Sequence, residues 1–179
     1  SHIYTTPGVY KVTVTVEDDS GALDTKEFRY VVVYDPTGAF VTGGGQIDSP
    51  SGAYPADPSL TGKAQFGFVS KYQKGATVPD GNTQFMFHAG NLMFKSTSYD
   101  WMVIAGAKAM FKGTGTINGE GNYKFMLSAI DGDMPGGNGV DKFRIKIWDP
   151  STDAVIYDNN MGADEYADPT TALTHGSIK

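Results

Sequence analysis

The chain has 179 residues, of which 40% are hydrophobic and 19% are charged, and its formal net charge is −6. This composition is typical of a globular protein, and the acidity argues against a nucleic-acid partner, because nucleic acids are bound by clustered Lys and Arg. Cysteine is absent, which excludes disulfides and thiolate chemistry. No apolar run approaches the length of about 18 residues that inserts into a membrane as a helix.

Glycine, tyrosine and phenylalanine are frequent, with 23, 10 and 10 copies. Turn-forming residues recur about every 8 to 15 positions, and helical periodicity is hard to find. This pattern predicts an all-β protein whose main part is an antiparallel β-barrel or β-sandwich of about eight to ten strands.

The N-terminal segment predicts a β-hairpin. Apolar Tyr10, Val12 and Val14 alternate with polar residues, which is the period of a half-buried strand. Residues 17–21 (EDDSG) are turn formers, and a second strand is expected over 28–34.

This hairpin, SHIYTTPGVYKVTVTVEDDSGALDTKEFRYVVV, resembles the C-terminal half of a PKD domain, an immunoglobulin-like sandwich of extracellular proteins. The matching residues are His2, Tyr4, Pro7, Gly8, Tyr10, the valine ladder, Asp18 and Gly21. The resemblance implies an extracellular location. It also implies that residues 1–35 are the C-terminal part of a PKD-like domain, and that the first half of this domain belongs to a longer chain.

A boundary is expected at the turn residues Asp35-Pro36-Thr37-Gly38, with a linker at 36–38. The following stretch, FVTGGGQID, is not a phosphate-binding loop, because no Lys-Ser/Thr and no helix follow its glycines. We expect it to be the first strand, over 39–47, of a second all-β domain at 39–179.

The second domain resembles a domain found behind PKD-type modules in bacterial surface and secreted proteins. The resemblance rests on FVTGGG and on the blocks FKGTGTINGEGNYKFMLSAIDG and DKFRIKIWD. It implies a location, but it implies no activity.

Further strands are expected along this domain. Asn118-Gly119 and Gly90-Asn91 predict two-residue hairpin turns. Residues 101–111 predict one long strand with small residues in its middle, and Phe143 and Ile145 alternate with basic residues in a later strand.

An oxygen-rich loop at 131–141 is a candidate calcium site. Its predicted ligands are Asp131, Asp133, Asn138 and Asp141, since calcium takes six to eight oxygen ligands in flexible geometry. The EF-hand pattern fails, because a lysine occupies the position of the bidentate Glu. The alternative is an ordinary turn rich in Asp and Asn.

A glycan is the second candidate ligand. Tyr99 and Trp101 could stack on sugar rings, and a basic stripe of Lys142, Arg144 and Lys146 could meet an anionic glycan. The alternatives are a core or rim position for the aromatic residues and a solvated strand face for the basic ones.

Catalysis is not predicted. The three histidines are dispersed, His88 being the one expected inside a strand, and no pair of carboxylates is marked. A hydrolase, or self-cleavage at Asp35-Pro36, stays open as an alternative.

The sequence therefore predicts a non-catalytic extracellular structural or adhesion module of a larger bacterial surface or secreted protein. A carbohydrate-binding module, calcium-assisted, is the alternative. No cofactor is required in the first case. The expected partners are neighbouring domains of the parent chain, an extracellular or cell-wall glycan, and a second copy of the chain through the N-terminal hairpin, whose two edges are open.

Overall fold

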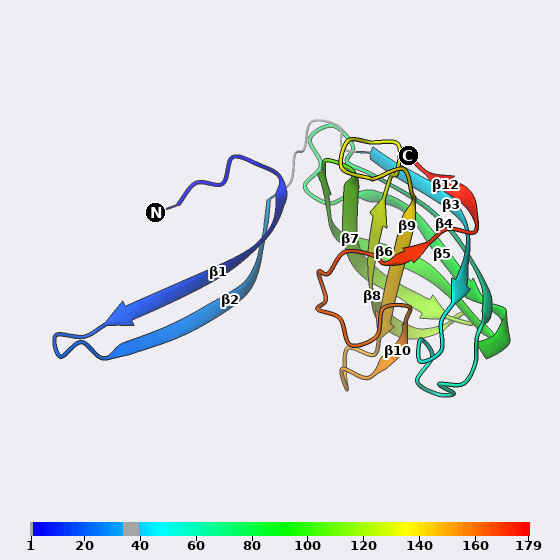
Figure 1. Cartoon of the computed structure of the whole chain (residues 1–179), viewed down its shortest axis with the longest axis horizontal. Helices are drawn as coiled ribbons and strands as arrows, with labels where there is room; N and C mark the ends of the chain where they lie inside the picture. The colour runs from blue at the N-terminus through cyan, green and yellow to red at the C-terminus, as the bar shows by residue number, and fades with distance from the viewer. Residues whose placement is uncertain (1, 34–39) are drawn as a thin grey trace.

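The computed structural model describes residues 2–33 and 40–179, and within residues 28–30 it describes the backbone only. The described residues form two antiparallel β-sheets and no α-helix (Figure 1). The first sheet has two strands, β1 (Gly8–Glu17) and β2 (Leu23–Val33), and the second has ten. The predicted all-β architecture is confirmed.

The larger sheet is a meander, in which strands that follow one another in the chain lie side by side from β3 to β10. Its strands are β3 (Phe40–Ser49), β4 (Gly62–Lys71), β5 (Asp80–Phe87), β6 (Leu92–Ala105), β7 (Lys108–Ile117), β8 (Glu120–Ile130), β9 (Lys142–Trp148), β10 (Val155–Asp158), β11 (Thr171–Ala172) and β12 (His175–Ile178). Short connections make such antiparallel neighbours the expected pairing.

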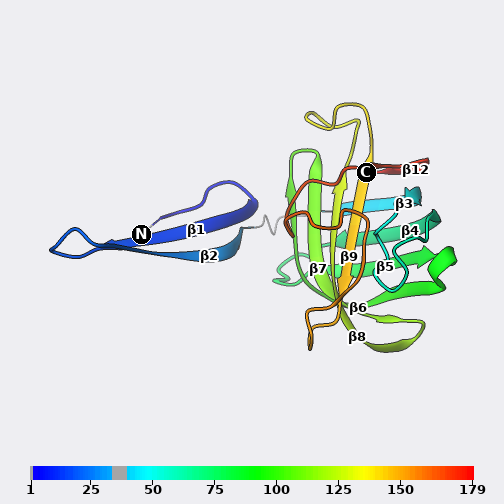
Figure 2. The same ribbon diagram turned by 60° about the horizontal axis from the view of Figure 1, so that its bottom comes forward.

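The sheet curls into a barrel-like shape, and the C-terminal segment links its two sides (Figure 2). Thr171 in β11 pairs with Phe143 of β9, and four residues later His175 in β12 pairs with Gln46 of β3. One short segment thus pairs with β9, the strand next to the end of the meander, and with β3 at its other end. These pairings satisfy some of the backbone groups that would otherwise form open sheet edges.

Aromatic side chains fill the interior of the barrel. Phe66 on β4 stacks on Phe143 of β9, with ring centroids 3.9 Å apart, so opposite walls touch directly. Phe85, Phe111 and Phe125 are also buried in this core. Each such side chain stabilises the fold by about 1.5–3 kcal/mol through burial.

The predicted strand at 101–111 is wrong. β6 ends at Ala105, a tight turn with Gly106 at φ +59° follows, and β7 begins at Lys108. The small residues in the middle of this stretch form a turn. The apolar residues on both sides of them also fit a continuous strand, so the sequence pattern did not indicate the turn.

The two predicted hairpin turns differ in outcome. Asn118 and Gly119 have φ of 52° and 84° and form the expected two-residue turn between β7 and β8. Gly90-Asn91 belongs instead to a longer connection, a 3₁₀ turn at His88–Gly90 with Asn91 in the left-handed region. His88, expected within a strand, therefore lies exposed in this turn.

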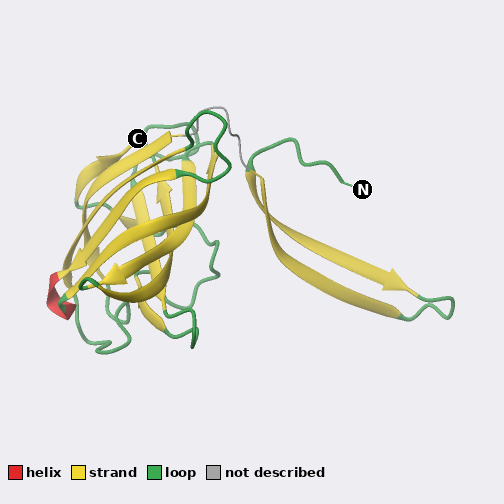
Figure 3. Cartoon of the chain, turned by 180° about the vertical axis from the view of Figure 1, so that it is seen from behind, coloured by secondary structure: helices red, strands yellow, loops and turns green. Residues whose placement is uncertain are grey.

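The N-terminal hairpin is present as predicted, with partners from Gly8–Val33 to Glu17–Leu23 (Figure 3). Its second strand begins earlier than expected. Tyr34, the predicted linker 36–38 and the Asp35-Pro36 bond lie outside the described residues. At the base of the hairpin, Gly8 and Val9 line a small cavity together with Val103, Met110 and Tyr166 on the barrel.

Candidate functional site

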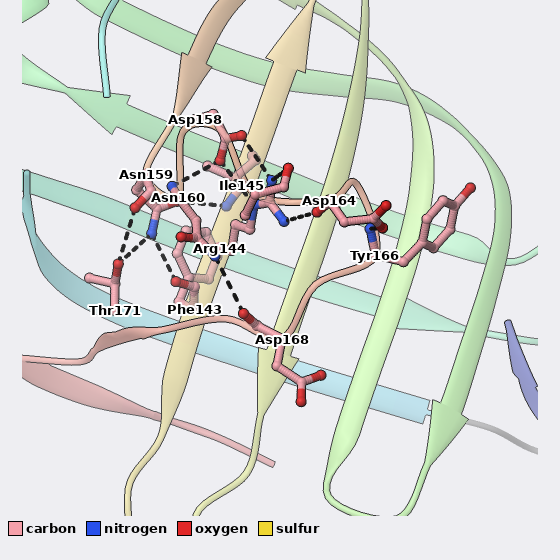
Figure 4. A network of polar contacts seen from close by, with 11 residues as sticks. Phe143, Arg144, Ile145, Asp158, Asn159, Asn160, Asp164, Tyr166, Asp168 and Thr171 are labelled. Atoms are coloured by element: carbon pink, nitrogen blue, oxygen red, sulfur yellow. Dashed lines mark hydrogen bonds and ion pairs between the residues drawn. The ribbon is translucent and has the colours of Figure 1, made fainter. Parts of the chain in front are cut away.

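Residues 159–170, here called the strap, connect β10 to β11 and lie against the outside of the barrel (Figure 4). Beneath the strap, Arg144 points outward from β9 and yet is only 2% exposed. Its Nε and Nη2 donate to Oδ1 and Oδ2 of Asp158, both at 2.9 Å, and its Nη1 donates to the carbonyl of Asp164 at 2.7 Å. The guanidinium is thus paired and satisfied inside the protein.

Asn159 forms hydrogen bonds with the edge of β9 in the gap between the part paired with β10 and the part paired with β11. Its Oδ1 accepts from the N–H of Ile145, and its Nδ2 donates to the carbonyl of Phe143 and to Thr171 Oγ1, each at 2.9 Å (Figure 4). One amide side chain therefore supplies hydrogen bonds that a neighbouring strand would otherwise make.

Three further contacts hold the strap to β6 and β7. Lys112 pairs with Glu165 at 3.0 Å, Lys108 pairs with Asp168, and the ring of Tyr166 stacks on Trp101. Acidic residues of the strap thus form ion pairs with basic residues of the sheet, and these pairs hold the strap in place.

The residues predicted to bind a glycan do not share one exposed surface. Tyr99 is buried and its hydroxyl lies 2.8 Å from that of Thr83, while Trp101 is partly covered by the strap. Arg144 is buried in its ion pair, Lys146 lies over the ring of Trp148, and Lys142 is half-buried at the start of β9.

Burial raises the pKa of the Tyr99 phenol, and it raises the pKa of the Tyr157 phenol more strongly. The hydroxyl of Tyr157 donates to Ser49 at 2.8 Å in the barrel interior. Both phenols therefore remain neutral at ordinary pH and act as hydrogen-bonding groups of the core.

The carboxylates of the 131–141 loop accept hydrogen bonds from the protein. Asp141 accepts from the N–H of Gly132 at 2.6 Å and of Ile178 at 2.7 Å, and Asp131 accepts from the N–H of Asp133. A hydrogen bond from Lys179 lowers the pKa of Asp133 below its usual value.

Within residues 2–33 and 40–179, no group of three or more His, Cys, Asp or Glu side chains is placed to hold a metal ion. Asn138, the fourth predicted ligand, lies in the same loop with φ +60°. Calcium binding at this loop stays a prediction.

A hollow on the other side of the barrel, here called the trough, was missed by sequence reasoning. It has a volume of about 540 Å³ and lies over β4 and β5, reaching β3 and β6. The residues that contribute to its outward surface are Thr42, Gln65, Gly67, Val69, Asn82, Gln84, Met86 and Met93. Alternation predicts that the polar residues among them face outward, but only strand register places the eight together.

These features define an all-β protein with a two-stranded hairpin followed by a curled, barrel-like antiparallel sheet of ten strands. Residues 1–33 match the PKD domain family. The match covers the hairpin and supports the predicted PKD-type segment, whereas the resemblance proposed for 39–179 stays a prediction.

No curated protein and no solved structure matches the chain. Among the described residues, no helix has the length and apolar character needed to cross a membrane.

Proposed function

We propose that this chain is a non-catalytic extracellular module of a larger bacterial surface or secreted protein, with a structural or adhesive role. The observation that carries the proposal is the PKD match at residues 1–33, directly followed in the chain by a barrel. PKD-type segments occur in extracellular proteins, where they space and support neighbouring domains.

The geometry of the barrel supports display from a longer chain. Thr42 at its start and Lys179 at its end exchange two backbone hydrogen bonds, of 2.9 and 2.8 Å. Residues near the start and the end of the barrel thus lie side by side.

The ion pairs of the strap also support a structural role. Arg144, Lys108 and Lys112, which could otherwise bind an anionic ligand, hold the strap to the sheet instead. Their charges hold the strap over the outer face of the sheet.

The proposal is tested by adhesion and by turnover. Beads coated with the full chain should attach to purified bacterial cell wall or extracellular matrix more than beads coated with albumin. Panels of glycoside, ester and peptide substrates should show no turnover above buffer. Attachment equal to that of albumin, or turnover that persists through repurification, would contradict the proposal.

Self-cleavage is tested on the same material. The intact mass of the full chain should stay constant during incubation at mildly acidic and neutral pH. A pair of fragments that separate at Asp35-Pro36 would instead show that the chain processes itself.

A carbohydrate-binding role is the second candidate function, and the trough is the observation that favours it. Calcium assistance belongs to this alternative. Glycan binding measured with and without a chelator tests both parts.

A further inference from the structure

We propose that the trough is a binding site for an uncharged, extended glycan chain. The inference deepens the adhesive role proposed above and rests on it. The volume of about 540 Å³ lies within the range of small-molecule sites, about 300–1,000 Å³.

Strand register arranges the lining of the trough in rows across the sheet. Gln65 on β4 pairs with Met86 on β5, which pairs with Met93 on β6. In the next row Gly67 pairs with Gln84, and the row beyond places Val69 opposite Asn82. The three rows present amide groups beside apolar surface, and their residues alternate with the buried Phe66, Phe68 and Phe85 along consecutive strands.

Glycine lies at the floor of the trough although no neighbouring atom there would exclude a larger side chain. A Cβ added at Gly67 would meet nothing within 4 Å, and one at Gly44, its partner on β3, would lie 3.7 Å from the nearest atom. By contrast, Gly43 and Gly45 on either side are enclosed by Phe68 and by the carbonyl of His175. Glycine weakens a strand interior, and it often marks a place where a ligand approaches the backbone.

The chemistry of the lining favours a neutral hydroxyl-rich ligand. Asn82, Gln65 and Gln84 each carry an amide that both donates and accepts, as paired sugar hydroxyls require. Val69 and Met86 offer apolar surface to the C–H faces of sugar rings. The residues that line the trough include no charged side chain, so a charged ligand would lose hydration there without a compensating partner.

A peptide fits this face less well than a glycan does. Peptides usually join a sheet by pairing with an open strand edge. In β4 the backbone groups are already paired with β3 on one side and β5 on the other. A peptide would therefore be limited to side-chain contacts.

The test uses the full chain and a panel of neutral linear hexasaccharides, namely β-1,4-glucan, β-1,4-xylan, α-1,4-glucan and chitin types. We expect binding of at least one of them in calorimetry. Gly67→Val, which fills the floor, should weaken that binding by at least about tenfold through steric exclusion. Gln84→Ala should weaken it as well, through the loss of an amide partner.

The matched control is Thr13→Val, which places the same side chain on an exposed strand position of the hairpin. It should leave the affinity unchanged. The melting temperature of Gly67→Val should not fall below that of the natural chain, because its Cβ enters open space. A loss of binding is then a loss of the site rather than of the fold.

Three outcomes would overturn the inference: no binding of any hexasaccharide, binding unaffected by Gly67→Val, or tighter binding of a peptide that Gly67→Val abolishes. Attachment of coated beads without hexasaccharide binding would leave the adhesive role standing and refute the trough as its site. Hexasaccharide binding without bead attachment would refute adhesion alone.

Discussion

At the scale of single residues, polar side chains on the outer face of β9 determine how the C-terminal part packs. Arg144 and Asp158 form a buried pair with two hydrogen bonds, and Asn159 occupies the edge between two short strands. Buried charges stabilise a fold only while both partners and their hydrogen bonds are present.

Replacing Arg144 by Met should therefore be strongly destabilising, because Asp158 would be left buried without its counter-charge. We expect a loss of about 3–5 kcal/mol in the free energy of unfolding, measured by urea denaturation. The control is Lys63→Met, which breaks the exposed pair with Asp48 and should cost less than about 1 kcal/mol. Equal losses in the two variants would show that burial of the Arg144 pair is unimportant.

A second residue-scale prediction concerns alkaline pH. Burial raises the pKa of the Tyr157 phenol above its unfolded value of about 10, so the unfolded chain releases this proton first as the pH rises. Its contribution to stability is complete below about pH 10 and is lost as the pH rises from there toward the folded pKa. The free energy of unfolding should fall above about pH 10, and less so in Tyr157→Phe.

Tyr157→Phe also removes the hydrogen bond to Ser49, so at neutral pH it should cost about 1 kcal/mol. Urea denaturation at several pH values separates the two effects. A pH dependence identical in the variant and the natural chain would assign the alkaline loss to other groups, such as Tyr99.

At the scale of elements, two neighbouring glycines of β3 have different structural roles. A Cβ at Gly45 would overlap the carbonyl of His175 in β12, whereas one at Gly44 would lie 3.7 Å from the carbonyl oxygen of Phe66, an ordinary contact distance. The glycine at Gly45 lets β12 approach, and Gly44 pairs with Gly67 of the trough without adding a side chain beside it.

Substituting Ala at these neighbouring positions should give opposite results. Gly45→Ala should destabilise by about 1–3 kcal/mol, because the methyl group overlaps β12. Gly44→Ala should be neutral or should stabilise by up to about 1 kcal/mol, because alanine restricts the unfolded chain. Melting temperatures of the two variants decide this, and a similar loss in both would contradict the assignment.

The 131–141 loop is the element in which metal binding can be tested most directly. Its carboxylates accept hydrogen bonds from backbone N–H groups and from Lys179. If the loop binds calcium as the sequence predicts, chelation should lower the melting temperature. A bound ion at 100 times its dissociation constant would contribute about 2.7 kcal/mol, which a melting curve detects. A lower melting temperature in chelator, absent from an Asp131→Ala, Asp133→Ala double variant, would establish a calcium site.

At the scale of the whole molecule, the barrel has a buried core, whereas the two-stranded hairpin exposes much of its apolar surface. In the described chain β1 and β2 pair only with each other, and their outer half exposes Val14, Val16 and Leu23 to solvent. An isolated hairpin is marginal in water, and its open edges favour pairing with another strand.

We therefore expect the full chain to self-associate through the hairpin as its concentration rises, as measured by light scattering. A Val14→Lys, Val16→Lys double variant should stay monomeric, because charges on the strands oppose edge pairing. Monomers at all concentrations, with amide exchange over residues 10–16 as fast as in an unfolded chain, would contradict this expectation.

Much of the local structure follows from the sequence, for a physical reason. Alternation places Phe143 and Ile145 in the core, and Asn118-Gly119 forms the expected turn. The turn at Gly106 was missed because small apolar residues fit both a strand and a tight turn. The trough was missed because its residues come from separate strands, and register is not encoded in any one of them.

The sequence by itself determined that this chain is all-β, that it begins with a PKD-type hairpin and that Arg144 lies on the outer face of its strand. These properties depend on side-chain period and turn chemistry, which are local. Only the tertiary structure decided that β11 and β12 link β9 to β3, that the strap buries Arg144 and that Gly67 lies with residues of other strands in one trough. These properties depend on contacts between residues far apart in the chain, where two- and four-residue strands carry too little pattern to predict a partner.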